Sequence, residues 1–223
     1  MCIRDRDQVA ALSHQHAAAA QAAGGFDDEI VPVAVPQRRG EPVLVTADEG
    51  IRPDTTVESL AGLRAAFADG GSITAGNSSQ ISDGASAVVV TTRGTAEAKG
   101  WPVLVTVGAS GQTAGPDNSL QAQPARAIER ACEKQGIAPA DLDVVEINEA
   151  FGAVVARSQV ELGLSSDVVN IHGGGIAIGH PIGASGTRLV VHVAHELARR
   201  GSGTAAVGLC GGGGQGEALI LTR

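Results

Sequence analysis

The sequence has few aromatic side chains, few cysteines and no long apolar run. Phe, Trp and Tyr make up 2% of the 223 residues, and tyrosine is absent. The core must therefore be built from Val, Ile, Leu and Ala, and a hydrophobic content of 43% is enough for a well-buried one. Because no apolar run reaches membrane-spanning length, we expect a soluble protein that does not contact a membrane.

Charge and cysteine content narrow the class of protein further. The formal net charge is −8, and the 16 Lys and Arg residues form no long cluster, which argues against nucleic acid as a partner. A single anionic small ligand, held by a few arginines and backbone amides, stays compatible with this charge. The three cysteines lack the spacing of a disulfide framework, so we predict a reducing, cytoplasmic location.

Helical and apolar segments alternate along the chain, which indicates an α/β fold. Hydrophobic spacing predicts helices over residues 7–23, 57–67, 124–135, 150–162 and 187–200. Strands or extended segments are predicted over 29–36, 42–46, 85–91, 103–107, 144–147, 205–209 and 217–221. Segment 85–91 (ASAVVVT) has the composition of a buried strand, and the last two strands can form an antiparallel hairpin.

The first six residues differ in character from the rest of the chain. Met1–Arg6 has no helix cap, no hydrophobic period and no secretory signal. We interpret residues 1–6 as a non-native leader joined in frame to a truncated gene.

A glycine-rich stretch, Asn170–Gly186 (NIHGGGIAIGHPIGASG), holds the first candidate for chemistry. Such loops occur where the backbone takes a positive φ or approaches another group closely. His180 lies between Gly179 and Pro181, and proline restricts the residue before it. A neutral imidazole here can take a proton from a thiol or hydroxyl, or donate to an oxyanion; the alternative is a histidine that only bridges a turn.

Two other segments place a reactive side chain where an apolar strand ends. Asn148 can cap the next helix, or hold a water or an oxyanion. Cys210 precedes four glycines, whose amides can favour a thiolate; inert packing is the alternative. Cys132, inside a helix, is interpreted as packing, and Cys2 as part of the leader. Together with His180, these two side chains predict a catalytic constellation.

Two neighbouring features receive structural interpretations. Glu149 follows Asn148, and an acidic residue in the first turn of a helix is ordinary dipole chemistry, so we interpret it as structural support. Gly211, Gly213 and Gly216 satisfy G-x-G-x-x-G, but a strand rather than a helix follows them. A nucleotide-phosphate loop is therefore disfavoured.

Taken together, three segments resemble the thiolase family: NEAF (Asn148–Phe151), GGGIAIGHPIGASG (Gly173–Gly186) and CGGGGQG (Cys210–Gly216). The resemblance continues through AGNSSQISDGA, EGIRPDTTVESLAGLRAAF and FDDEIVPV, and so covers nearly everything after Arg6. It implies the layered α-β-α-β-α thiolase fold, here as the C-terminal half plus part of the loop domain. The implied division is 7–80 in the CoA-binding loop domain, 81–106 as the last piece of the N-terminal domain, and 107–223 as the C-terminal domain.

The resemblance also implies a reaction and a role for each candidate. Thiolases condense two acetyl-CoA molecules to acetoacetyl-CoA plus CoA, or catalyse the reverse thiolysis, and act in fatty acid metabolism. The position of His180 activates a nucleophilic cysteine, and that of Cys210 moves the α-proton. The position of Asn148 holds a water that completes an oxyanion hole with His180, and the backbone amide of Gly212 donates to a second one.

Ligands and partners are implied by the same resemblance. It places CoA contacts at Arg52, Ser59, Ser79 and Phe151. Coenzyme A thioesters are substrates, and neither a metal nor a permanently bound cofactor is expected. The full-length enzyme is expected to be a homodimer or a homotetramer.

The chain departs from the family at one point. No Cys-Gly/Ser-Ser-Gly segment is present to supply the acylated cysteine, so we expect this chain alone to be inactive. The alternative is a non-catalytic thiolase-like module that binds CoA or lipid. The presence of both His180 and Cys210 favours the enzyme, and a condensing enzyme would present two histidines instead. The biosynthetic and degradative branches both stay open.

Overall fold

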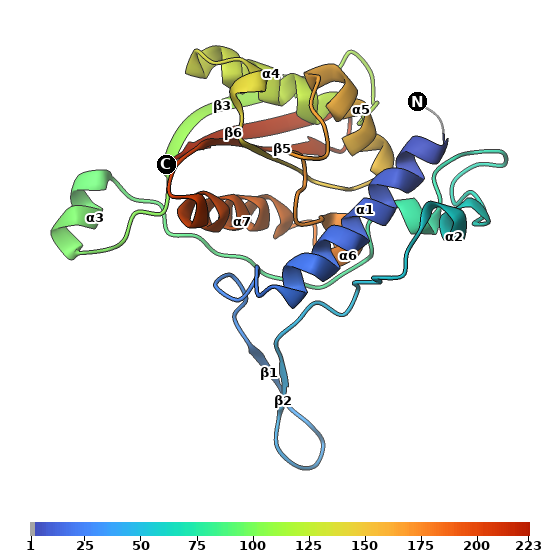
Figure 1. Ribbon diagram of the computed structural model, residues 1–223, viewed down its shortest axis with the longest axis horizontal. Coiled ribbons are helices and arrows are strands. Elements are labelled where there is room, and N and C mark those ends of the chain that lie inside the picture. Colours follow the sequence, from blue (N-terminus) through green and yellow to red (C-terminus); the bar gives the residue numbers. More distant parts are fainter. Residues whose placement is uncertain (1–2) are drawn as a thin grey trace.

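A computed structural model describes residues 3–223 (Figure 1). The helices are α1 (Ile3–Ala22), α2 (Val57–Ala61), α3 (Arg93–Lys99), α4 (Gln123–Gln135), α5 (Gly152–Leu162), α6 (Gly175–Ile178) and α7 (Ser185–Arg200). The strands are β1 (Val33–Val35), β2 (Val43–Val45), β3 (Thr106–Ala114), β4 (Val144–Ile147), β5 (Thr204–Gly211) and β6 (Gln215–Thr222). Across residues 3–223, no helix is both long and apolar enough to cross a membrane.

A four-stranded sheet forms the centre of the fold, in the order β3-β6-β5-β4. Strands β5 and β6 pair antiparallel, as predicted for the last two strands, and β3 pairs antiparallel with β6. Strands β4 and β5 run parallel, which requires a long crossover connection. That crossover contains α5, α6 and α7, and with them the glycine-rich stretch.

Helices cover both faces of this sheet (Figure 1). On one face Val144 packs with Leu189, Val193 and Leu197 of α7. On the other face Val145 and Ile147 pack with residues of α4 and α5. Neighbouring strand residues thus point to opposite layers, as the pleat of a strand requires. The large apolar side chains that are fully buried are Ile, Leu and Val, in agreement with the shortage of aromatics.

Glycines in the left-handed conformation end the three helices that pack on the sheet. Gly136 (φ 78°) ends α4, Gly163 (φ 67°) ends α5 and Gly201 (φ 82°) ends α7. Each donates its backbone N–H to a carbonyl of the last turn, which is the usual glycine cap. These three helices end at the predicted residues and begin within two residues of the predicted starts.

Helix α1 crosses the edge of the body and packs on α5, α6 and α2. It begins at Ile3, so residues 3–6 of the predicted leader continue into it. The backbone of Arg6 lies so close to Gly152 that a Cβ there would stand 2.7 Å from the Arg6 carbonyl oxygen. Residues 1 and 2, including Cys2, lie outside the described range. That residues 1–6 are non-native stays a prediction.

The prediction of a buried strand at 85–91 is wrong. Within residues 3–223 this segment pairs with no other strand, and Val89 and Val90 are 80% and 72% exposed. An apolar run of this kind is buried only where neighbouring strands and a covering layer exist. Residues 3–223 supply neither around it.

Two other predicted elements, a helix and a strand, have boundaries that differ from those in the structure. Helix α2 ends at Ala61 rather than at residue 67, because Gly62 follows it and the chain turns there. The strand predicted over 103–107 begins at Thr106, because Thr106 pairs with Thr222, the last residue of β6. Residues 103–105 therefore lie beyond the end of their partner strand.

The backbone of α4 packs closely against Gly111 of β3, and a substitution at Gly111 can test this contact. A Cβ at this position of β3 would lie 1.9 Å from the Ala127 carbonyl oxygen and 2.7 Å from the Ala131 nitrogen. Because both atoms belong to the α4 backbone, Gly111→Ala must push the helix away. We expect the free energy of unfolding to fall by about 3 kcal/mol in urea denaturation followed by circular dichroism.

Gly94→Ala in α3 is the matched control, since no atom lies within 4 Å of a Cβ there. It should leave stability unchanged or raise it by about 0.5–1 kcal/mol. Equal stability of the two variants would contradict the close contact between α4 and β3.

Candidate active site

The structure brings Asn148 and His180 into direct contact. Asn148 follows the end of β4 and is fully buried, and its backbone N–H donates to the Gly208 carbonyl oxygen at 2.9 Å. Its Nδ2 lies 3.1 Å from His180 Nε2. The next helix begins at Gly152, and its N-cap residue is Phe151, so Asn148 is not the helix cap. Its side chain is positioned for contact with the imidazole instead.

Ser185, a residue that the sequence analysis missed, fixes the tautomer of His180. Ser185 Oγ lies 2.6 Å from His180 Nδ1 and donates its hydrogen to the Pro181 carbonyl oxygen at 2.9 Å. Because a hydroxyl has one hydrogen, Ser185 must accept from His180 Nδ1–H. The lone pair of the imidazole is then on Nε2, where the Asn148 amide donates to it. The sequence offered one signal: Ser185 lies in the GASG turn, five residues after His180.

The surroundings of His180 keep the imidazole neutral. Burial lowers its pKa, and the positive charge of Arg188 lowers it further. A neutral histidine with its lone pair on Nε2 can act as a proton acceptor near neutral pH once the Asn148 amide gives way to the proton donor. The role of His180 as a base stays a prediction.

Glu149 anchors the glycine-rich loop behind His180. Its buried carboxylate accepts hydrogen bonds from Ser13 Oγ (2.5 Å), Asn170 Nδ2 (2.8 Å) and the Ile176 backbone N–H (3.1 Å). Burial is the largest influence and raises the pKa of Glu149, while these donors oppose the rise. The helix-dipole explanation offered for Glu149 is wrong, since α5 begins three residues later. Its interpretation as structural support agrees with these contacts.

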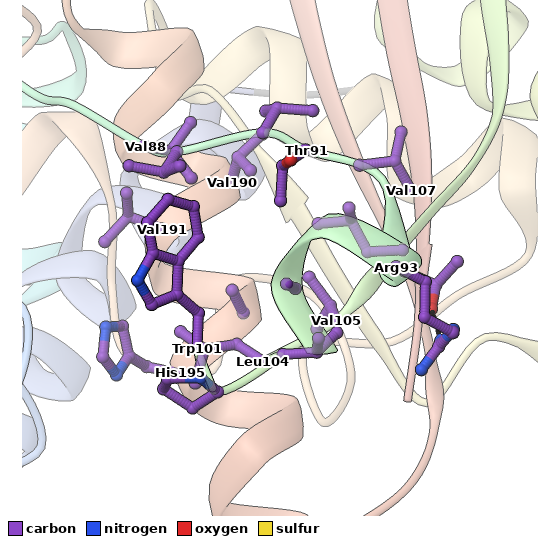
Figure 2. A pocket seen from close by; sticks show the side chains of 18 of the residues that line it. Val88, Thr91, Arg93, Trp101, Leu104, Val105, Val107, Val190, Val191 and His195 are labelled. Carbon is purple, nitrogen blue, oxygen red and sulfur yellow. Dashed lines mark hydrogen bonds between the residues drawn. The ribbon is translucent and has the colours of Figure 1, made fainter. Parts of the chain in front are cut away.

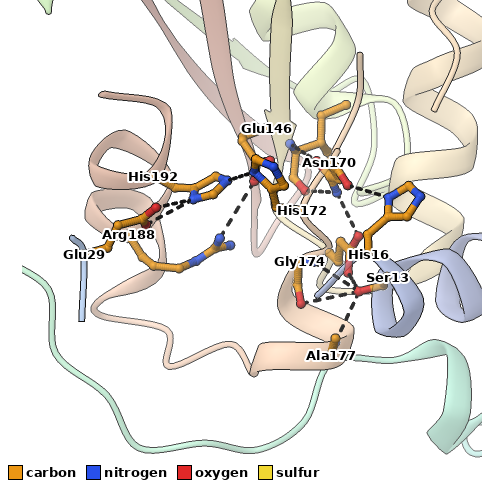
Figure 3. A network of polar contacts seen from close by, with 12 residues as sticks. Ser13, His16, Glu29, Glu146, Asn170, His172, Gly174, Ala177, Arg188 and His192 are labelled. Carbon is orange, nitrogen blue, oxygen red and sulfur yellow. Dashed lines mark hydrogen bonds and ion pairs between the residues drawn. The ribbon is translucent and has the colours of Figure 1, made fainter. Parts of the chain in front are cut away.

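Ser13 and Asn170 complete this anchor, and the sequence analysis missed both roles (Figure 3). Ser13 Oγ also accepts from the backbone N–H groups of Gly174 (3.1 Å) and Ala177 (3.3 Å). Asn170 bridges to Ile147 of β4 through both ends of its amide. Asn170 has a φ of 51°, a conformation that asparagine tolerates better than most residues, and this was its only sequence signal.

Cys210 lies near these residues but packs against the other layer. It belongs to β5, two residues after Gly208, which pairs with Ile147. Its side chain packs with the cluster formed by α4 and α5, which also contains Phe151. Asn148 and Cys210 thus lie at the carboxyl ends of two neighbouring parallel strands, where ligands bind in many α/β proteins.

The protonation state of Cys210 differs from the sequence-based prediction. The four following glycines were expected to favour a thiolate, but burial raises the pKa of the Cys210 thiol. The resting side chain is therefore a thiol. Cys132 is 1% exposed within α4, and burial raises its pKa as well, which agrees with a packing role.

Gly212 opens the turn that joins β5 to β6. Its backbone is exposed, and no atom lies within 4 Å of a Cβ built there. Gly213 and Gly214 then take positive φ values of 86° and 76°, which a tight turn of this kind requires. The arrangement leaves open space beside the Gly212 backbone.

Two of the four predicted CoA-contact residues, Ser79 and Phe151, lie at or beside the NEAF segment. Ser78 forms an isolated bridge with Phe151, and the Ser79 backbone N–H donates to the Ala150 carbonyl oxygen at 3.1 Å. The Phe151 ring meets Phe67 edge-on, with centroids 5.8 Å apart, and Phe67 is exposed. Segment 78–80 and the NEAF segment therefore lie side by side.

The other two predicted contacts have different settings. Arg52 is exposed, and its backbone N–H donates to His14 Nδ1 at 3.1 Å. Ser59 takes part in the capping box of α2, where its Oγ donates to the Thr56 carbonyl oxygen at 2.8 Å. In the described residues, neither side chain contacts Asn148, His180 or Cys210.

A separate apolar cleft of about 670 Å³ lies between residues 87–92, residues 101–107 and α7 (Figure 2). Its lining includes Val88, Trp101 and Val190. None of the eight predicted site residues lines it. The cleft results from the uncovered segment 85–91 and is distinct from the candidate site.

Two family models match the chain. The model for "Thiolase, N-terminal domain" matches residues 3–94, and the model for "Thiolase, C-terminal domain" matches residues 101–223. A probable acetyl-CoA acetyltransferase of Mycolicibacterium smegmatis is 57% identical over 219 residues, which are 98% of this chain and 56% of that protein.

Comparison with solved structures also matches this chain to proteins of the thiolase family. The acetyl-CoA acetyltransferase of Bacillus anthracis matches with a TM-score of 0.95 and 39% identity, over 100% of this chain and 56% of that chain. Human mitochondrial 3-ketoacyl-CoA thiolase in complex with CoA matches with a TM-score of 0.90 and 34% identity, over 100% and 55%. These likenesses confirm the predicted thiolase fold. The chain spans about half the length of the proteins it matches.

The raised pKa of Cys210 gives a testable pH dependence. At about pH 8, iodoacetamide should modify Cys210 more slowly than a free cysteine, because little thiolate is present. The rate should keep rising above about pH 9, where an unperturbed thiol approaches its plateau. Mass spectrometry of proteolytic peptides measures both described cysteines together, and Cys132 should react more slowly still. A rate for Cys210 that levels off below about pH 8 would overturn the assignment.

Proposed function

Because this chain belongs to the thiolase family, we propose that it carries the acid–base half of an acyl-CoA acyltransferase site. The proposed reaction is the condensation of two acetyl-CoA molecules to acetoacetyl-CoA plus CoA, or the reverse thiolysis. The observation that carries the proposal is the hydrogen-bond chain Asn148–His180–Ser185, which presents a neutral imidazole at the carboxyl end of β4. The proposed setting is fatty acid metabolism in the cytoplasm.

His180 is the base for the nucleophile. Its Nε2 takes the proton from the thiol of a cysteine that residues 1–223 do not contain, and the thiolate attacks the first thioester. The Nδ1–H bond to Ser185 supports the imidazolium that forms. The charged ring then donates from Nε2 to the thioester oxygen of the second acyl-CoA. Asn148, at 3.1 Å from Nε2, holds a water that donates to the same oxygen.

Cys210 moves the α-proton. Because burial raises its pKa, the resting thiol can protonate the departing CoA thiolate during acylation. The Cys210 thiolate that remains is then a strong base for the weakly acidic α-carbon of the second thioester. The open backbone at Gly212 gives an amide donor to the second oxyanion hole. CoA itself contacts Phe151, Ser79, Arg52 and Ser59.

The exchange of the methyl protons of acetyl-CoA in D₂O tests the proposal on this chain. Exchange needs a base and an oxyanion hole but no acylated cysteine. We expect the chain to exchange these protons faster than buffer, at a rate that rises with pH as Cys210 ionises. Cys210→Ala should lower the enzymatic rate by at least about 100-fold, and Asn148→Ala by about 10²–10³-fold. Proton NMR monitors the reaction.

Three controls sharpen this test. Cys132→Ala changes the other described cysteine and should leave exchange unchanged, because Cys132 only packs within α4. Calorimetry measures CoA binding to every variant. The chain alone should not catalyse thiolysis of acetoacetyl-CoA. If it binds CoA without exchange, the alternative of a non-catalytic CoA-binding module takes the place of the enzyme.

We also propose that the full-length enzyme is a homodimer or homotetramer. The β1–β2 hairpin projects from the body (Figure 1), and Val33, Val43 and Leu44 on it are 59%, 53% and 58% exposed. Exposed apolar surface of this kind is typical of a contact between subunits. A second copy of the chain is the proposed occupant.

Charges placed on this hairpin test the contact. Val33 and Val43 lie on the same face of the two paired strands, so Val33→Lys with Val43→Lys should weaken association at least about tenfold in light-scattering measurements. Val160→Lys is the control, because Val160 is 72% exposed on α5, away from the hairpin. Equal association of both variants would exclude the hairpin as the contact.

A further inference from the structure

A row of polar side chains lies between β4 and α7, next to the contact of Asn148 with His180. On β4, Glu146 shares the face that Val144 turns toward α7, and Asn148, two residues further on and just past the strand, continues this face. On α7, Ser185, Arg188 and His192 have the spacing i, i+3, i+7 and share one face. The pair Glu146–Arg188 thus lies one step below the group of Asn148, His180 and Ser185.

Glu146 is fully buried, and few groups around it stabilise the negative charge of its carboxylate (Figure 3). Both of its carboxylate oxygens lack a hydrogen-bond donor among the described residues. Arg188 Nη1 lies 3.8 Å from Glu146 Oε2, and the buried Arg188 Nη2 lacks an acceptor among the same residues. Burial raises the pKa of Glu146 to about 7, although His192 and Arg188 oppose the rise. The carboxyl therefore changes its charge near neutral pH.

We propose that Glu146 and Arg188 form a positioning pair for His180, in which the buried carboxylate holds the guanidinium below Ser185 and neutralises its charge. This inference rests on the proposed function, because it concerns the base of that reaction. It adds two residues that do not touch the substrate to those that do. The pair acts on the imidazole through the electric field of Arg188.

The direction of the effect is set by the charges. With Glu146 ionised, the charge of Arg188 is balanced, and His180 binds a proton more readily. With Glu146 protonated, the unbalanced guanidinium lowers the pKa of His180 further. A rise in pH through the range in which Glu146 ionises therefore makes His180 a better base.

Other charged groups also lie around Arg188. Most of them form hydrogen bonds or ion pairs with other residues, and one belongs to a different segment. Glu149 is held by three hydrogen-bond donors, and Glu29 pairs with His192 at 2.8 Å. His192 also contacts His172, at 3.1 Å between their ring nitrogens. Asp48 approaches from the connection after β2. Glu146 also faces His192, and the charge of each favours the ionised form of the other. Among residues 3–223, Glu146 is the carboxylate that forms an ion pair with Arg188 while both of its oxygens lack a hydrogen-bond donor.

NMR titration of the 223-residue chain with ¹⁵N-labelled histidine tests the pair without any turnover. The His180 signals are assigned by their loss in His180→Gln. Glu146→Gln should lower the pKa of His180 by about half a pH unit or more. Arg188→Met should raise it by less, because Glu146 already balances much of the charge of Arg188. In the Arg188→Met background, Glu146→Gln should have a much smaller effect, because buried Glu146 is protonated once Arg188 is removed.

Two further variants guard against a purely structural effect. Glu196→Gln removes a carboxylate of α7 that pairs with Arg199 and Arg200, and it should leave the titration of His180 unchanged. Glu146→Asp should restore most of the shift, because it restores the charge. Circular dichroism confirms the fold of each variant. If Glu146→Gln destabilises the chain, the Arg188→Met titration still decides.

The results separate this inference from the proposed function. An unchanged pKa of His180 in folded Glu146→Gln and Arg188→Met variants overturns the pair, even if acetyl-CoA exchange is present. Shifted titrations without acetyl-CoA exchange support the pair and overturn the proposed reaction.

Discussion

The candidate site depends on one buried carboxylate, that of Glu149. A charge in a protein interior is tolerated only where hydrogen bonds replace its water, and here the donors come from α1, from the loop after residue 169 and from α6. Three distant parts of the chain are thereby tied to the end of β4. A Cβ at Gly174 would lie 2.6 Å from the carboxyl carbon of Glu149, so a larger residue there would displace this hydrogen-bonded carboxylate. His180 comes six residues later in the same loop, so the hydrogen bonds of Glu149 help to fix its position.

The two proposed proton carriers lie on different layers of the fold. His180 contacts Asn148 on the side of α7, whereas Cys210 packs with the cluster of α4 and α5. A substrate that meets both must lie across the carboxyl end of the sheet, over β4 and β5. Burial lowers the pKa of His180 and raises that of Cys210.

The sequence was informative wherever the cause of a structure is local. Glycine caps, the period of α4 and α7, and the glycine turns around His180 and Cys210 all depend on neighbouring residues, and they were predicted well. The role of Ser185 depends on the path of the turn after Pro181, and that of Glu146 on which helix covers β4, so neither could be predicted from spacing. Segment 85–91 was mispredicted for the same reason: the burial of an apolar run depends on neighbouring strands, and residues 3–223 place none beside it.

That uncovered segment also affects how the chain behaves in solution. Val88, Val89 and Val90 lie exposed in succession on an extended backbone. Free backbone amides beside β-branched side chains are a template on which another extended segment can add as a strand. Self-association of this kind grows with concentration and is open-ended, unlike the closed contacts of a dimer or tetramer. Precipitation of the isolated chain at high concentration would therefore reflect this exposed extended segment rather than a weak core.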